Sequence, residues 1–131
     1  MAKARGDHPV GAESVSAPSY HYRAFVNRVI DGDSIVCDVD LGFDLWKRNI
    51  HIRLNGIDTP ELRSKDPAER EVARAVRDYV KDLIEGRDVL LDVHGTGKYG
   101  RWIATVYVEK LEWQSLNYNL VETGRAKRVS Y

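Results

Sequence analysis

The sequence predicts one amphipathic helix, over residues 66–86, in a chain whose other apolar segments show the alternation of β-strands. A single long helix between groups of strands limits the folds that the chain can adopt. Asp66 is placed as the N-cap, Pro67 fits the first helical position, and Glu69 has capping-box spacing. Gly86 follows as a C′ residue. The apolar stripe consists of Val72, Val76, Val80 and Leu83, with Tyr79 and Ile84 beside them. This stripe is a structural face that packs on a core.

The remaining apolar segments predict strands on both sides of that helix. They cover residues 22–30, 34–40, 50–54, 88–94 and 101–109. Residues 41–49 are predicted to be a connection with Gly42 as its turn, and Ser115 can cap a short helix that ends near Gly124. Strands, then a helix, then strands indicate an α+β fold that is mainly β, with a small barrel closed by a helix.

The length of 131 residues suits one domain. Residues 1–20 are rich in Gly, Ala, Ser, Pro and charge and are expected to be a flexible tail, so the folded domain covers residues 21–131. The single cysteine, Cys37, lies in an apolar run and is expected to be buried. No signal-peptide h-region or membrane-spanning segment is found, so we expect a cytoplasmic monomer with no membrane partner, or a secreted protein if a leader was removed.

Three short segments carry side chains suited to one kind of chemistry. They are Asp31-Gly32-Asp33-Ser34, the stretch from Arg53 to Glu61 that contains Asp58-Thr59-Pro60-Glu61, and Lys98-Tyr99-Gly100-Arg101. Carboxylate oxygens suit a hard divalent cation, whereas the planar guanidinium group of arginine suits a phosphodiester. Their presence on one small domain favours metal-assisted cleavage of a phosphodiester.

Two of these segments also have a plain structural interpretation. Asp-Gly pairs form tight turns, and the loop that starts at Asp31 lacks the glycine and the glutamate that an EF-hand needs at its sixth and twelfth positions. Thr59 and Glu61 could cap a helix, but the helix signals lie several residues later. Because Pro60 keeps Thr59 extended, Asp58 and Glu61 emerge from one rigid bend. The histidines show no ligand spacing, so a histidine-based metal site is not expected.

Together, the three segments resemble those of the staphylococcal nuclease family. The resemblance runs from about residue 22 to the C-terminus and includes the end segment Leu120-Val121-Glu122-Thr123-Gly124-Arg125-Ala126. The family fold is a five-stranded OB-type β-barrel packed with helices. The resemblance therefore implies a calcium-dependent nuclease that binds one Ca²⁺ ion and hydrolyses DNA and RNA with little sequence preference.

The resemblance also implies a metal site and a general base. Asp33 and Asp58 align with carboxylate ligands of the Ca²⁺ ion, and Thr59 aligns with a ligand that uses its backbone carbonyl. Glu61 aligns with the proposed general base, which acts on a water molecule associated with the metal. Asp31 aligns with a nearby acidic position that supports the ligands.

A second group of aligned residues concerns the nucleic-acid substrate. Arg53 and Arg101 align with the arginines that bind the scissile phosphate and stabilise its developing negative charge. Tyr99 aligns with a tyrosine that borders the phosphate pocket, and Lys98 could add a phosphate contact. The nucleotide-stacking tyrosines near the C-terminus are not matched, since Ser130 lies where one is expected.

Two functions without catalysis compete with the nuclease hypothesis. One is a binding module of the same fold for nucleic acid or protein, but such modules typically lose the acidic and arginine positions that this chain retains. The other is a generic OB-type single-strand binder, which would need alternating basic and aromatic residues that the sequence does not show. The formal net charge is zero, so any nucleic-acid binding depends on a local basic cluster rather than on a general basic coat.

Overall fold

The structure is a computed structural model that describes residues 19–130, so all but the last two residues of the predicted tail lie outside the described part. The elements along the chain are β1 (His21–Asp31), β2 (Ser34–Gly42), β3 (Leu45–Leu54), β4 (Ile57–Asp58), α1 (Pro67–Ile84), β5 (Asp88–Thr96), η1 (Lys98–Gly100), β6 (Trp102–Val108), η2 (Glu109–Leu111), β7 (Gln114–Ser115), α2 (Leu116–Glu122) and β8 (Lys127–Arg128).

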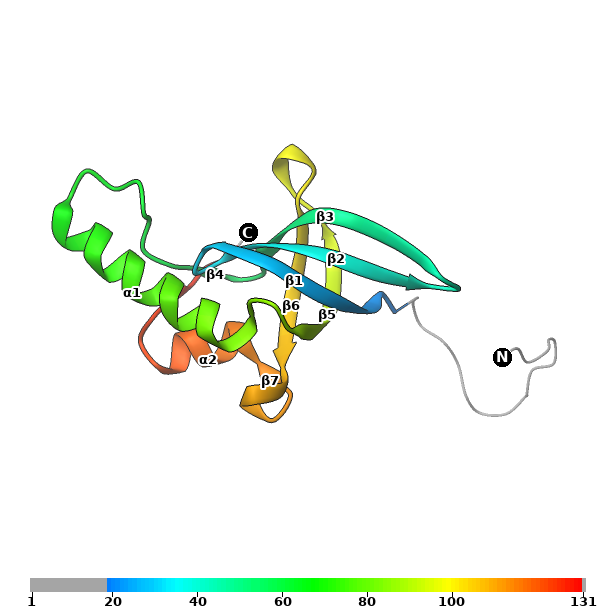
Figure 1. The fold of residues 1–131 in the computed structure, drawn as a ribbon. Helices are drawn as coiled ribbons and strands as arrows, with labels where there is room; N and C mark the ends of the chain where they lie inside the picture. The colour runs from blue at the N-terminus through cyan, green and yellow to red at the C-terminus, as the bar shows by residue number, and fades with distance from the viewer. Residues whose placement is uncertain (1–18, 131) are drawn as a thin grey trace.

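The strands β1, β2, β3, β5 and β6 form a closed barrel. The main sheet has the order β3-β2-β1-β5-β6-β7, and an additional parallel pairing between β3 and β6 joins its ends. Figure 1 shows α1 and α2 together on one side of this barrel, with the joined ends of β2 and β3 projecting on the other side. The predicted α+β class, mainly β with packed helices, is confirmed.

The prediction for residues 41–49 is wrong, because these residues belong to a long hairpin. β2 continues to Gly42 and β3 begins at Leu45, so only Phe43 and Asp44 form the turn. Both turn residues have positive φ values, 55° and 63°, as a two-residue type I′ turn requires. The strands were missed because this part of the hairpin extends beyond the core, with Phe43 98% exposed and Leu45 63% exposed.

The ends of α1 agree with the sequence signals. Asp66 accepts a hydrogen bond from the Ala68 N–H at 3.0 Å, and Pro67 is the first helical residue. At the other end, Gly86 has a φ of 74° and donates its N–H to the carbonyl of Val26 on β1. A glycine is needed there because other residues rarely adopt this conformation. The helix is therefore tied to the barrel at its C-terminal end.

Two details predicted for α1 are corrected. The buried face consists of Ala73, Val76, Val80 and Ile84, whereas Val72 is 52% exposed. A helix of this length has room for only one buried stripe, and Val72 lies beside it rather than on it. The capping box does not form either, because the carboxylate of Glu69 is directed to the preceding loop.

The core lies inside the barrel and between the barrel and the helices. Val80 and Ile84 of α1 and Leu116 and Leu120 of α2 join the buried strand residues in one cluster. Cys37 is fully buried in it, as predicted, and burial raises the pKa of its thiol to about 12. Within the described residues, no helix is long and apolar enough to cross a membrane.

Candidate active site

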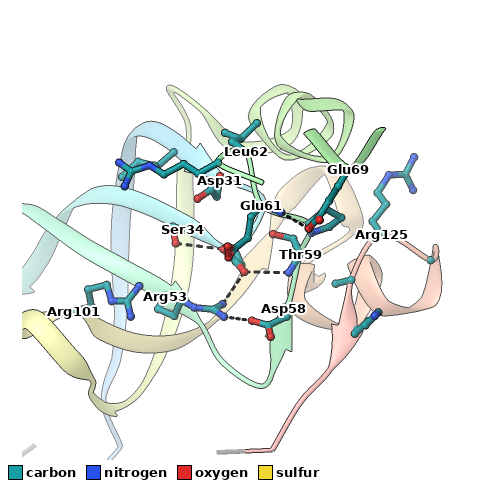
Figure 2. A pocket seen from close by; sticks show the side chains of 17 residues that line it. Asp31, Ser34, Arg53, Asp58, Thr59, Glu61, Leu62, Glu69, Arg101 and Arg125 are labelled. Atoms are coloured by element: carbon teal, nitrogen blue, oxygen red, sulfur yellow. Dashed lines mark hydrogen bonds and ion pairs between the residues drawn. The ribbon is translucent and has the colours of Figure 1, made fainter. Parts of the chain in front are cut away.

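An open pocket of about 850 Å³ lies where several distant parts of the chain meet. It is lined by the turn between β1 and β2, the end of β3, the segment from β4 into α1, the start of β6 and the segment between α2 and β8. The last of these segments reaches the pocket because β8 pairs antiparallel with β4, which makes Lys127 the partner of Asp58. Figure 2 shows the side chains that line this pocket.

Asp33 lines the pocket and is only 9% exposed. Its carboxylate accepts a hydrogen bond from the backbone N–H of Thr59 at 3.1 Å and one from the Ser34 hydroxyl at 3.3 Å. The preceding turn packs tightly here, since a Cβ atom on Gly32 would lie 2.6 Å from Cγ1 of Val76 and 3.0 Å from Cγ2 of Thr59. The absence of a side chain at Gly32 therefore lets the Asp33 turn contact both α1 and the Thr59 segment.

Arg53, at the end of β3, connects the two carboxylates that were predicted to bind metal. One guanidinium nitrogen lies 3.1 Å from Oδ2 of Asp33, and the other pairs with Oδ1 of Asp58. The Arg53 side chain is 13% exposed, whereas that of Asp58 is 58% exposed. A positive charge therefore lies directly between the two acids, at the bottom of an open pocket (Figure 2).

Two buried oxygen atoms beside these acids have no hydrogen-bond partner in the described part of the chain. They are Oγ1 of Thr59, a residue that is 8% exposed, and Oδ1 of Asp31. Buried polar atoms are nearly always paired, so such atoms commonly mark a position for water or an ion. Both residues line the pocket.

The oxygen atoms fit a hard cation, but not through carboxylates alone. Among residues 19–130, no group of three or more His, Cys, Asp or Glu side chains is arranged to hold a metal ion. A Ca²⁺ ion takes 6–8 oxygen ligands and accepts backbone carbonyls and water molecules among them. The carboxylates of Asp33 and Asp58 and the oxygens of Thr59 are therefore a chemically suitable but incomplete set, which water would have to complete.

Asp31 lines the same pocket and is unusually easy to protonate. Burial raises the pKa of its carboxyl group, and the negative charges of Asp33 and Glu61 raise it further, while Arg63 and Arg77 oppose the change. The carboxylates of Asp31, Asp33 and Glu61 therefore lie close enough together at the pocket to repel one another.

Glu61 lies on the loop that precedes α1, and its side chain extends toward the middle of the pocket in Figure 2. The residue is exposed, and its carboxylate has no hydrogen bond or ion pair within the described residues. The backbone of Glu61 is nevertheless held, because its N–H donates to Glu69 at 3.4 Å and its carbonyl accepts from the Ser64 N–H at 3.2 Å. The carboxylate is therefore free to interact with a substrate or a water molecule.

The third predicted segment is only partly at the pocket. Arg101 lines it, and its Nε donates a long hydrogen bond of 3.4 Å to the Lys98 carbonyl, with no carboxylate partner among residues 19–130. Lys98 and Tyr99 are not among the lining residues, and Tyr99 is 94% exposed with a φ of 62°. The structure therefore brings together all the predicted site residues except these two.

Four charged residues that line the pocket were not predicted from the sequence to belong to the site: Arg63, Glu69, Arg125 and Lys127. Arg125 and Lys127 lie at the pocket because β8 pairs with β4. Each of these strands has only two residues, which is too short to give a periodic pattern in the sequence. The only sequence signal for Arg125 is that its segment, residues 120–126, resembles a motif of the family.

Comparison with known proteins identifies the family. Residues 51–131 match the family model described as "Staphylococcal nuclease homologue". The chain belongs to the staphylococcal nuclease family. A thermonuclease of Staphylococcus intermedius is 30% identical over 128 residues, which cover 96% of this chain and 70% of the thermonuclease.

Fungal proteins also resemble this chain. A probable endonuclease lcl3 of Neosartorya fischeri is 32% identical over 89 residues, and that of Aspergillus clavatus is 34% identical over 90 residues. Each match covers 63% of this chain but only 30% or 31% of the fungal protein. The chain thus spans about a third of the length of these fungal relatives.

Proposed function

We propose that this protein is a Ca²⁺-dependent nuclease that hydrolyses the phosphodiester bonds of DNA and RNA with low sequence specificity. The observation that carries the proposal is the convergence of Asp33, Asp58, Arg53, Glu61 and Arg101 on one open pocket. This set combines hard oxygen ligands, a carboxylate free to accept a proton and guanidinium groups for a phosphate.

Different residues of the pocket would serve different steps of hydrolysis. Attack by water on phosphorus places negative charge on the phosphate oxygens, and the guanidinium groups of Arg53 and Arg101 can donate charge-assisted hydrogen bonds to those oxygens. Glu61, whose carboxylate has no partner in the described chain, can accept the proton of the attacking water or orient it. These contacts engage the phosphate and not the base, which supports low sequence specificity.

A cation would be held by Asp33, Asp58 and Thr59, all of which line the pocket. When bound, Ca²⁺ would supply positive charge beside the reacting phosphate and make a bound water more acidic. The protein contributes the fixed geometry, since Asp33 is hydrogen-bonded to the Thr59 backbone and to Ser34.

The test is incubation of the purified protein with single-stranded DNA, duplex DNA and RNA, in Ca²⁺ and in excess chelator, with fragment length followed over time. Degradation in Ca²⁺ that stops in chelator supports the proposal, and the three substrates report the strand preference. Binding without cleavage in Ca²⁺, Mg²⁺ or Mn²⁺ would contradict it and would favour the non-catalytic binding module.

A further inference from the structure

Arg125 lines the pocket but has no part in the proposed chemistry. Its backbone position is fixed by the end of α2, where Gly124 has a φ of 76°. The Arg125 N–H donates to the Leu120 carbonyl at 2.8 Å, and the Gly124 N–H donates to the Val121 carbonyl at 3.1 Å. These two bonds are the hydrogen bonds of a Schellman motif, so the residue after the glycine is held in place.

The side chain of Arg125 is held as well. Its guanidinium carbon lies 3.6 Å from the centre of the Tyr79 ring, which is a stacked cation–π contact. The Tyr79 hydroxyl in turn donates a 2.8 Å hydrogen bond to Oδ1 of Asn119, which connects α1 to α2. The ring is therefore a fixed platform, and the guanidinium group on it loses little freedom on binding a ligand.

The chemistry of this arrangement favours an anion. Stacking occupies the face of the guanidinium group and leaves the N–H groups at its edges available, which is the orientation that recognises phosphate oxygens. Within residues 19–130, Arg125 has no carboxylate partner. Arg53 differs in this respect, because it faces the carboxylates of Asp33 and Asp58.

The position of Arg125 suggests which anion it meets. Figure 2 shows Arg101 and Arg125 on opposite sides of the acidic residues of the pocket. At about 850 Å³ the pocket lies within the range of ~300–1,000 Å³ that accommodates whole small ligands, so it exceeds the needs of one phosphodiester. A nucleic-acid strand carries a negative charge on every nucleotide, so a strand bound for cleavage brings further phosphates with it.

We propose that Arg125, stacked on Tyr79, binds the phosphate of a nucleotide next to the one whose bond is cleaved. The inference rests on the proposed nuclease function and adds a requirement to it. The preferred substrate has at least two consecutive phosphodiesters, and an isolated diester lacks the group that Arg125 recognises.

The first test compares substrates with and without a neighbouring phosphate. Wild type, Arg125→Ala and Arg125→Lys are assayed in Ca²⁺ on a labelled oligonucleotide and on the p-nitrophenyl ester of thymidine 5′-phosphate, which has a single diester. For the oligonucleotide, Arg125→Ala should raise KM about tenfold with kcat little changed, the size of one charge-assisted hydrogen bond. Arg125→Lys keeps the charge without the stacked plane and should fall between the two. The small diester should be hydrolysed equally by all three.

The matched control is Arg74→Ala, which removes the same charge from an exposed position on α1 that does not line the pocket. It should leave KM for the oligonucleotide unchanged. Equal KM values for wild type and Arg125→Ala, with a change only in thermal stability, would overturn the inference and leave the nuclease function intact.

The second test is binding of the same oligonucleotide in chelator, measured by fluorescence anisotropy at several salt concentrations. Loss of one phosphate contact should weaken binding and reduce the slope of log K against log salt by about 0.7 for a single strand. An unchanged slope would overturn the inference. If the wild type binds but never cleaves, while Arg125→Ala still binds more weakly with the reduced slope, the nuclease function fails and the phosphate contact stands.

Discussion

The roles of Glu61 and Arg101 can be tested without disturbing the core, because neither side chain has an ion pair in the described structure. Glu61→Gln keeps the shape of the side chain but removes the proton acceptor, and Arg101→Ala removes a phosphate contact. Each should lower kcat/KM for DNA cleavage by about 100- to 10,000-fold, as is typical of general acid–base and charge-stabilising groups. Steady-state kinetics in saturating Ca²⁺ measures the effect.

The controls for these two variants are Glu71→Gln and Arg74→Ala, which make the same changes at exposed positions of α1. They should retain wild-type activity, and all four variants should unfold at nearly the wild-type temperature. Full cleavage by Glu61→Gln or Arg101→Ala would remove that residue from the mechanism.

Asp31 makes a prediction about pH and stability. The pKa of Asp31 is raised in the folded state, so the folded protein holds a proton on this carboxyl group more readily than the unfolded chain does. The free energy of unfolding therefore falls as the pH rises above 3.8, the ordinary pKa of this carboxyl group. Asp31→Asn should therefore raise the unfolding temperature at pH 7, and the gain over wild type should disappear below pH 3.8. Thermal unfolding in chelator at a series of pH values measures the difference.

If Asp31→Asn raises the unfolding temperature equally at low and neutral pH, the gain in stability does not come from removing the ionisation of Asp31. Asp44→Asn is the matched control, since Asp44 is exposed at the tip of the β2–β3 hairpin and does not line the pocket. It should not alter the pH dependence of stability.

At the scale of elements, the loop from Glu61 to Asp66 is held by the first turn of α1 through Ser64. The Ser64 hydroxyl donates to Glu69 at 2.7 Å and accepts from the Asp66 N–H at 3.1 Å, and its carbonyl accepts from Arg70 at 2.9 Å. The same Glu69 carboxylate accepts the backbone N–H of Glu61. The network therefore fixes the backbone that carries the candidate base.

Loosening this network should affect catalysis more than binding. Ser64→Ala removes the hydroxyl, and a displacement of about 1 Å at a reacting group can cost as much as 100-fold in rate. We expect kcat to fall about tenfold, with KM nearly unchanged and with faster amide exchange over residues 61–66. Ser64→Thr keeps the hydroxyl and should recover most of the activity. A lower kcat without faster exchange would contradict a positioning role.

The hairpin of β2 and β3 shows why one element could not be predicted. Alternation of apolar and polar residues identifies a strand when one face of the strand is buried. The part of β3 that precedes Asn49 extends away from the core, so its exposed residues Leu45 and Trp46 do not show this alternation. The turn residues, Phe43 and Asp44, are also atypical, since asparagine and glycine are the usual choices for positive φ. The bounds of helix α1 were predicted correctly because its N-cap, its first proline and its terminal glycine are local signals, although the predicted stripe wrongly included Val72.

At the scale of the whole molecule, the sequence predicted a small barrel with packed helices from the order of its elements and from the family resemblance. It also singled out the acidic and arginine residues that line the pocket, because these lie in contiguous motifs. It did not predict how these motifs are connected. The ion pair of Arg53 with Asp33 and the contact of Arg125 with Tyr79 depend on strand pairing and on the return of the chain after α2. Such contacts join residues far apart in sequence, and no local periodicity encodes them.

Asn117 supports this long-range arrangement and gives a prediction for the stability of the whole fold. It is 7% exposed, its carbonyl oxygen accepts the Val106 N–H at 3.0 Å, and its amide donates to the carbonyls of Asn55 and Ala104 at 2.9 Å and 3.2 Å. Removing the side chain leaves a buried N–H without its partner and weakens the contacts of two carbonyls. Each buried unsatisfied group costs about 1–3 kcal/mol, so Asn117→Ala should lower the free energy of unfolding by about 2–4 kcal/mol.

Urea denaturation measures this loss, and the m-value should stay constant if only the folded state is affected. Asn119→Ala is the matched control, because its side chain accepts a single, part-buried bond from Tyr79. It should cost about 1 kcal/mol. Because Asn55 lies in the turn between β3 and β4, the loss of Asn117 should also lower activity by more than the unfolded fraction explains. Activity that falls only in proportion to unfolding would show that this buried amide stabilises the barrel without positioning the pocket.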